Sequence, residues 1–110
     1  MGRYISTTGT AGVVTKQVAT TYQAVVNDRI LADSSSATFT ITLPLNASLL
    51  INDTIQIIDA TSNFGTNAVT VARNGSLIQG SAADLTMDLN GAIATLIYTG
   101  PTYGWIIGAV

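Results

Sequence analysis

The alternation of apolar and polar side chains is the feature that most constrains how this chain can fold. Between residues 37 and 43, threonine alternates with Phe, Ile and Leu in the run Ala37-Thr-Phe-Thr-Ile-Thr-Leu43. Successive side chains of a β-strand point to opposite faces of its sheet, so a period of two predicts a strand with one buried and one polar face. Similar Thr-, Ile- and Val-rich stretches follow, separated by short runs of Gly, Asn and Ser. We therefore expect an all-β fold.

The turn signals divide the alternating stretches into about eight short strands, a number typical of a small antiparallel β-sandwich or barrel. No stretch shows the period of an amphipathic helix of useful length. Tyr22–Val26 and Asp28–Ala32 are predicted to form the first strand pair. Further strands are predicted at 37–43, 54–59, 68–73, 76–79, 84–89, 92–98 and 105–107.

Three predicted hairpins depend on glycine. Asn74-Gly75 and Asn90-Gly91 each stand between strand-like runs. Both central positions of a type I′ turn need positive φ, which Asn and Gly tolerate. The first turn predicts pairing of 68–73 with 76–79, the second predicts pairing of 84–89 with 92–98, and a third hairpin is expected at 100–104.

The core is predicted from the apolar positions of the alternating strands, because these share one face of each strand. The expected core residues are Phe39, Ile41, Leu43, Ile55, Ile57, Val69, Val71, Leu96 or its neighbours Ile93 and Ile97, and Trp105.

Residues 1–21 have a different composition from the rest of the chain. They are rich in Thr and Gly, with Tyr4, Ile5, Val13 and Val14 as isolated apolar residues. Such a segment has too little apolar surface to order by itself, so we interpret it as an extended N-terminal arm that becomes ordered on a neighbouring protein. The all-β domain is expected to span residues 22–110.

The side chains that carry most enzyme chemistry are missing from the sequence. It contains no His, Cys or Glu, and its six carboxylates are all Asp. Nucleophilic catalysis has no evident base and a transition metal has no preferred ligand, so we expect neither an enzyme nor a cofactor. Calcium binding by Asp59, Asn63 and Asn67 is the best chemical alternative, although Asp at strand ends commonly caps turns.

Three aromatic residues lie close together near the C-terminus: Tyr98, Tyr103 and Trp105. They could stack sugars on a glycan-binding surface. The competing interpretation places Trp105 in the core beneath the last hairpin, because aromatic rings supply much of the buried area of small β domains.

The low charge of the chain points to contacts with other protein chains. Only 9% of the residues are charged, against roughly 25% in a typical soluble domain. The basic residues Arg3, Lys16, Arg29 and Arg73 are scattered, which argues against a nucleic-acid partner. No apolar run approaches the roughly 20 residues of a membrane span, so no membrane partner is expected. We expect an oligomer whose surface is partly covered by protein.

The chain carries several motifs in a distinctive order. They are Tyr22-Gln-Ala-Val-Val-Asn-Asp28, Phe39-Thr-Ile-Thr-Leu-Pro44, Asp53-Thr-Ile-Gln-Ile-Ile-Asp59, Asn63-Phe-Gly-Thr-Asn67, Arg73-Asn-Gly75, Ile78-Gln-Gly80, Tyr98 and Gly104-Trp105. Together these motifs resemble a β module found in structural proteins of tailed bacteriophages. The resemblance covers about residues 22–108 and implies a virion component, often a homotrimer, in fibre, tail or head-decoration proteins.

The resemblance and the composition together predict a capsid decoration, or cement, protein on the exterior of the virion. In this interpretation the domain is a rigid body, and Tyr4, Ile5, Val13 and Val14 contact the partner, either the major capsid protein or a tail or neck protein. The alternatives are a tail or neck fibre subunit and a carbohydrate-binding adhesin that uses Tyr98, Tyr103 and Trp105.

Overall fold

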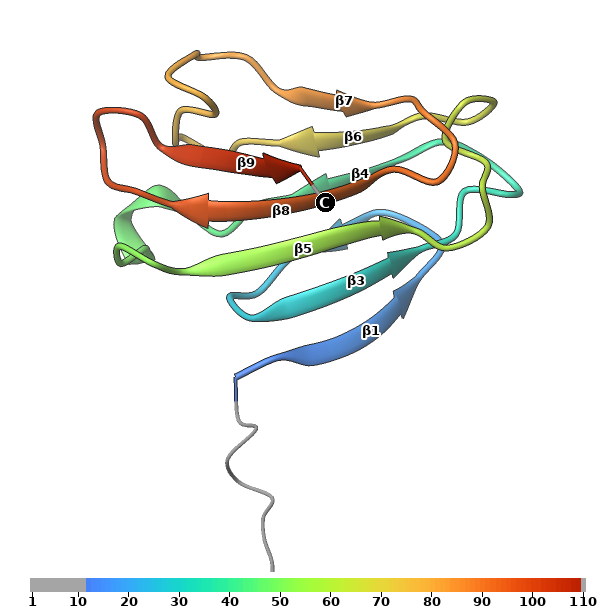
Figure 1. The fold of residues 1–110 in the computed structure, drawn as a ribbon, viewed down its shortest axis with the longest axis horizontal. Coiled ribbons are helices and arrows are strands. Elements are labelled where there is room, and N and C mark those ends of the chain that lie inside the picture. The colour runs from blue at the N-terminus through green and yellow to red at the C-terminus, as the bar shows by residue number, and fades with distance from the viewer. Residues whose placement is uncertain (1–11, 110) are drawn as a thin grey trace, which may run out of the picture.

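The computed structural model describes residues 12–109, which form an all-β fold of two sheets (Figure 1). Tyr4 and Ile5, two of the predicted partner-binding residues, lie outside the described residues. Within the described part of the chain, no helix is long and apolar enough to cross a membrane.

The larger sheet has five strands in the order β1-β3-β5-β8-β9. Its members are β1 (Val14–Val18), β3 (Asp28–Ala32), β5 (Thr54–Asp59), β8 (Ile93–Tyr98) and β9 (Trp105–Ala109). β1, β3 and β5 run parallel to one another, whereas β8 and β9 join as antiparallel neighbours.

The smaller sheet has four strands in the order β2-β4-β6-β7. They are β2 (Tyr22–Gln23), β4 (Phe39–Thr42), β6 (Val69–Ala72) and β7 (Leu85–Met87). The first three are parallel and β7 is antiparallel. A short 3₁₀ helix, η2 (Asn46–Ser48), lies in the connection between β4 and β5.

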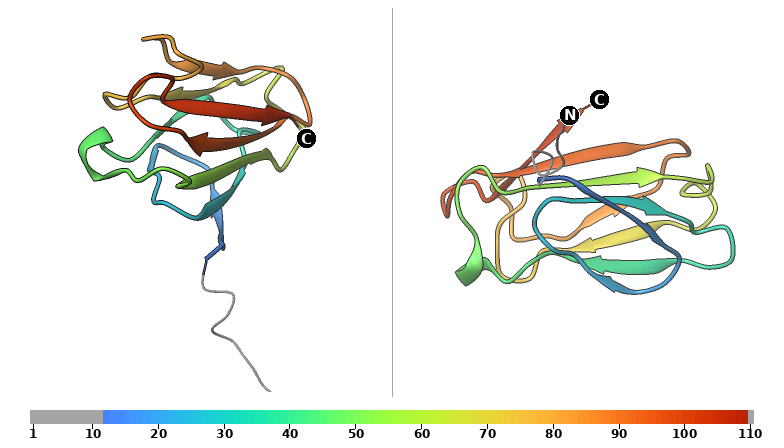
Figure 2. Two further views of the ribbon diagram at one scale, coloured as in Figure 1. Left: turned by 60° about the vertical axis from the view of Figure 1, so that its left-hand side comes forward. Right: turned by 90° about the horizontal axis from the view of Figure 1, so that it is seen from below.

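The first six strands alternate between the two sheets, so the chain winds from one layer to the other and back (Figure 2). Each turn of this winding places a strand beside, and parallel to, the strand of the turn before. The prediction of an antiparallel fold is therefore wrong: four pairings are parallel and three are antiparallel.

The predicted first strand pair is also wrong. β2 belongs to the smaller sheet and β3 to the larger one. Asn27, at a φ of 76°, reverses the chain between them, and the Asp28 N–H donates to the Val25 carbonyl. Polar residues at this point mark a turn, but the turn carries the chain across the core instead of folding it back along one sheet.

Both Asn-Gly segments form turns, but neither closes a tight hairpin between the segments predicted to pair, and in the second turn Gly91 has positive φ whereas Asn90 does not. Asn74 and Gly75 both have positive φ, and the Ser76 N–H donates to the Arg73 carbonyl at 3.2 Å. After this turn β6 pairs with β7 and not with 76–79. After Gly91, β8 pairs with β5 and β9 and not with 84–89. The hairpin at 100–104 is confirmed by the pairing of Tyr98 with Trp105.

The core between the sheets contains the predicted apolar residues. Ile41, Leu43, Ile55, Ile57, Val69, Val71, Leu96 and Trp105 are all 0% exposed, and Phe39 is 8% exposed. Ile93 and Ile97, the alternatives to Leu96, are each 37% exposed and point away from the core. The core also contains residues that were not predicted, among them Ile30, Phe64, Ile78 and Met87.

The predicted boundary between arm and domain at residues 21 and 22 requires a correction. β1 falls inside the predicted arm, but it pairs along its whole length with β3, and Val18 packs in the core. The composition of this segment concealed the strand because only one of its five residues is buried. The folded domain therefore includes β1.

Candidate functional site

The aromatic residues proposed as a glycan surface are mostly in the core. Trp105 is fully buried and Tyr98 is 8% exposed, and their rings meet edge to face with centroids 5.6 Å apart. Only Tyr103, 60% exposed, is available to a ligand. The core interpretation of Trp105 is confirmed, and the sugar-stacking surface loses two of its three rings.

The proposed calcium ligands have other roles. The buried Asp59 carboxylate accepts backbone N–H groups from Thr61, Asn63, Phe64 and Gly91 at 3.3, 3.2, 3.1 and 3.0 Å. The Asn67 amide donates to the Ser34 carbonyl at 2.8 Å. Asp59 thus organises the loop after β5, and the described residues contain no cluster of three or more acidic, His or Cys side chains that could hold a metal ion.

Hydrogen bonding controls the ionisation of Asp59. Burial by itself would raise the pKa of this carboxyl, but the backbone N–H groups stabilise the charged form and lower the pKa below its ordinary value. Asp59 is therefore a charged structural centre of the fold.

A second buried carboxylate joins the first three strands. Asp28, 3% exposed, forms an ion pair with Lys16 of β1 at 2.9 Å and accepts the Tyr22 hydroxyl of β2 at 2.7 Å. The Val25 N–H also donates to Asp28, at 2.9 Å. Hydrogen bonding to Tyr22 and then to Asp28 raises the pKa of Lys16 to about 12, so Lys16 stays charged at neutral pH. These contacts fasten the edge strand β1 to the domain.

The free side of β1 is the first candidate binding surface. The Val14 N–H and the Val18 carbonyl face β3, since they bond to Asn27 and to the Asp33 N–H at 2.9 and 2.8 Å. Backbone groups alternate in direction along a strand, so those of Thr15 and Gln17 point to the free side. No described residue pairs with them. We call this row the open edge.

Exposed valines flank the open edge. Val13 and Val14 are 56% and 52% exposed, and Val25, in the nearby 25–28 turn, is 53% exposed. Two of the predicted partner-binding residues, Val13 and Val14, thus lie together at the start of an unpaired strand. An unpaired edge next to apolar side chains can accept an added strand from another protein.

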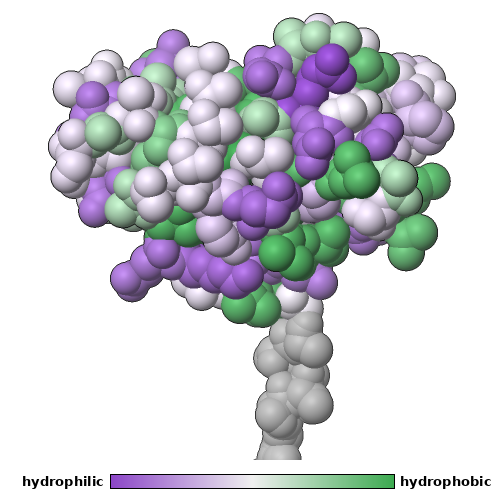
Figure 3. Space-filling view, turned by 180° about the vertical axis from the view of Figure 1, so that it is seen from behind, coloured by the Kyte–Doolittle hydropathy of each residue, from purple (hydrophilic) through white to green (hydrophobic). Residues whose placement is uncertain are grey.

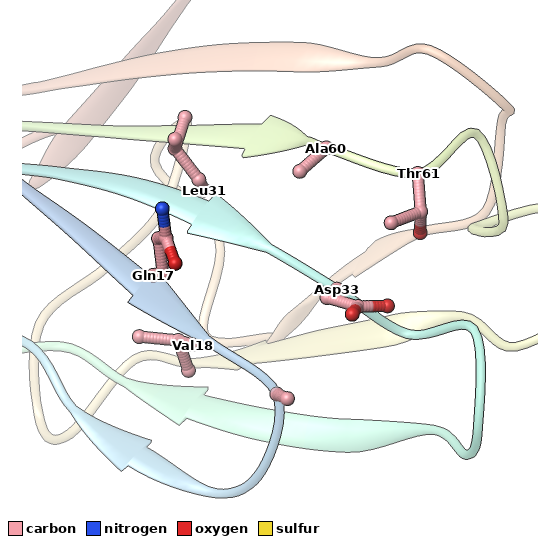
Figure 4. Close-up of a pocket in the computed structure, with 7 residues that line it drawn as sticks. Gln17, Val18, Leu31, Asp33, Ala60 and Thr61 are labelled. Carbon is pink, nitrogen blue, oxygen red and sulfur yellow. The ribbon is translucent and has the colours of Figure 1, made fainter.

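The outer face of the five-stranded sheet is the second candidate surface. Where β1, β3 and β5 end, a groove of about 380 Å³ is lined by Gln17, Val18, Ala19, Leu31, Asp33, Ala60 and Thr61 (Figure 4). Most of these side chains are apolar or neutral. The Asp33 carboxylate accepts the Ser35 hydroxyl and N–H at 2.6 and 2.9 Å, and these contacts lower its pKa, so the groove carries a negative charge.

Apolar side chains are also exposed in the loop around η2. Leu45, Leu50 and Ile51 are 55%, 72% and 66% exposed. Seen from behind, the molecule has apolar surface gathered on the side of this loop, while hydrophilic and intermediate residues cover most of the remainder (Figure 3).

Comparison with known proteins gives no relative: neither a family model nor a curated protein matches this chain. Inference about its function therefore depends on its own residues and surfaces.

Proposed function

We propose that this protein is a non-enzymatic structural component of a bacteriophage virion, a decoration protein that binds the capsid exterior as a homotrimer. The observation that carries the assembly role is the open edge of β1, with Val13 and Val14 exposed beside it. Extended segments bind such edges through main-chain hydrogen bonds, and neighbouring apolar side chains add buried area.

The way β1 is held supports this role. A strand that transmits load from a partner must itself be fixed to its domain. The ion pair between Lys16 and the buried Asp28, together with the pairing of β1 with β3, provides that connection. The contact with Tyr22 extends it to the second sheet.

The phage assignment is supported by the resemblance of residues 22–108 and by the low charge of the chain. Its motifs fall at structurally important places: Asp28 and Asp59 are the two buried carboxylates, and Trp105 is the largest fully buried side chain. Charged residues make up only 9% of the sequence, as suits a surface that other chains cover.

The test uses a proline at the open edge. Thr15→Pro removes an N–H that faces away from β3, so the pairing of β1 with β3 is retained while an added strand loses a donor. We expect the variant to remain folded by circular dichroism and to bind particles lacking this protein much more weakly. Thr15→Ala, which keeps the N–H, is the matched control.

Equal binding by the proline and alanine variants would refute attachment through the open edge. Copy number then separates decoration from the fibre alternative. A reconstruction with hundreds of copies on the head supports decoration, whereas a handful of copies at the tail or neck supports a fibre subunit.

A further inference from the structure

The outer face of the five-stranded sheet carries a continuous apolar row. Leu31 pairs with Ile58 and Ile58 pairs with Ile93, all at outward-facing positions of β3, β5 and β8. Ile93 is 37% exposed. The row runs across the strands, along the direction of the hydrogen bonds between them. An apolar line of this kind on a sheet face is suited to burial against another sheet.

Beside the apolar row lies a polar row that contains one charge. Arg29, Gln56 and Thr95 occupy neighbouring outward positions, and Arg29 donates to Gln56, which donates to Thr95, each at 3.1 Å. Among the described outward positions of the five strands, Arg29 is the sole charged residue. Burial of this face would leave the Arg29 guanidinium group without a charged partner unless the covering surface supplies a carboxylate.

The groove on the other side of the apolar row holds such a carboxylate. Arg29 precedes Leu31 by two residues and Asp33 follows it by two. At about 3.3 Å per residue, the two charged residues are separated by about 13 Å along the chain, too far to pair within one copy. The ion pair found among the described residues is instead Lys16 with Asp28.

We infer that three copies of this chain pack around a threefold axis along the Leu31–Ile58–Ile93 row, with Arg29 of each copy entering the Asp33 groove of the next. This inference rests on the homotrimer of the proposed function and identifies its interface. Around a rotation axis, the left side of each face meets the right side of its neighbour. Arg29 lies in β3 and Asp33 directly follows it, on opposite sides of Leu31, so the rotation brings Arg29 of one copy to Asp33 of the next.

The groove can hold both the aliphatic stem and the charged group of an arginine side chain. The apolar walls formed by Leu31 and Ala60 can cover the aliphatic stem, while the Asp33 carboxylate accepts the guanidinium group. The pair would close three times around the axis. The Arg29 guanidinium group would lose its contact with solvent and gain a contact with the Asp33 carboxylate. The apolar rows of the three copies would meet at the centre.

The experiment measures the mass of the full chain by sedimentation at micromolar concentration. We expect the wild type at three times the 11.4 kDa chain mass. Arg29→Asp and Asp33→Arg should each weaken association by about 30-fold or more, because each leaves like charges facing one another. The double variant R29D/D33R should restore the trimer, since it exchanges the charges. Asp88→Arg, at an exposed residue after β7, is the charge control.

Two further variants and one control test the charged and the apolar parts of the interface. Asp33→Asn retains an oxygen for the Ser35 contacts but removes the charge, and it should also weaken the trimer. Ile93→Glu tests the apolar row, with Leu89→Glu at another exposed apolar residue as its control. Circular dichroism should show all of them folded.

The outcomes separate the two proposals. A wild-type trimer that is unaffected by Arg29→Asp, Asp33→Asn and Ile93→Glu overturns this interface and leaves the proposed homotrimer standing. A wild-type monomer or dimer overturns both the interface and the homotrimer. Particle binding that survives in a monomer would show that attachment to the capsid does not require the trimer, and the Thr15→Pro variant would still test whether it uses the open edge.

Discussion

Replacing Asp59 by Asn should expose how much this fold depends on one buried carboxylate. In the wild type, one carboxylate oxygen accepts N–H groups from Thr61 and Asn63, and the other accepts those of Phe64 and Gly91. Asparagine keeps one oxygen and turns an amide NH₂ toward the other two N–H groups. Two donors lose their acceptor and face a further donor.

The cost can be worked out from the exposure of these donors. The bond from Phe64 is buried, so its N–H cannot readily turn to water, whereas the other three bonds are only part-buried. Hydrogen bonds to a charged group contribute about 1.5–3 kcal/mol each. Two of these bonds are lost in the variant, and at least one of the two freed N–H groups can turn to water, which reduces the cost. The free energy of unfolding should therefore fall by about 2–4 kcal/mol.

The same contacts predict a dependence on pH. The pKa of Asp59 is lower in the folded than in the unfolded chain. Its stabilising contribution is therefore full above the unfolded pKa, near 4, and is lost as the pH falls through the folded pKa. The variant has no carboxyl at this position and should lose less stability on acidification than the wild type.

Urea unfolding at pH 7 and at successively lower pH, followed by circular dichroism, measures both effects. Asp88→Asn, at an exposed carboxylate, controls for the loss of one negative charge. Equal stability of the wild type and Asp59→Asn at pH 7 would refute the argument, as would parallel loss of stability in both proteins on acidification.

Two other changes test the core and the N-terminal boundary. Ile57→Ala should lower the free energy of unfolding by about 2–5 kcal/mol, because Ile57 is 0% exposed and the truncation leaves a cavity; an unchanged melting temperature would contradict this. Deleting residues 1–12 should leave a stably folded domain. Deleting residues 1–21 should destabilise it strongly, since that removes β1, the core residue Val18 and the partner of the buried Asp28. Equal melting temperatures of the two truncated proteins would show that β1 is dispensable to the fold.

Local sequence determined most of the strands and which of their faces are buried; the exceptions are β1, which it did not reveal, and 76–79, which is not a strand. The alternation in β4, β5 and β6 places each inward apolar residue at a position that the structure buries, because side-chain direction follows directly from the backbone of a strand. It also determined the turns at Asn74-Gly75 and Gly91, where the conformations needed are available to these residues by themselves.

The tertiary structure alone decided which strands become neighbours. Asn74-Gly75 reverses the chain in the same way whether or not the flanking strands pair, and the several Thr-, Val- and Ile-rich strands offer each other similar edges. Their partners are chosen by the joint burial of residues far apart in the sequence, such as Ile57 beside Ala94. The groove that unites Gln17, Leu31, Asp33 and Thr61 depends on the same choice, because parallel winding brings the ends of β1, β3 and β5 together.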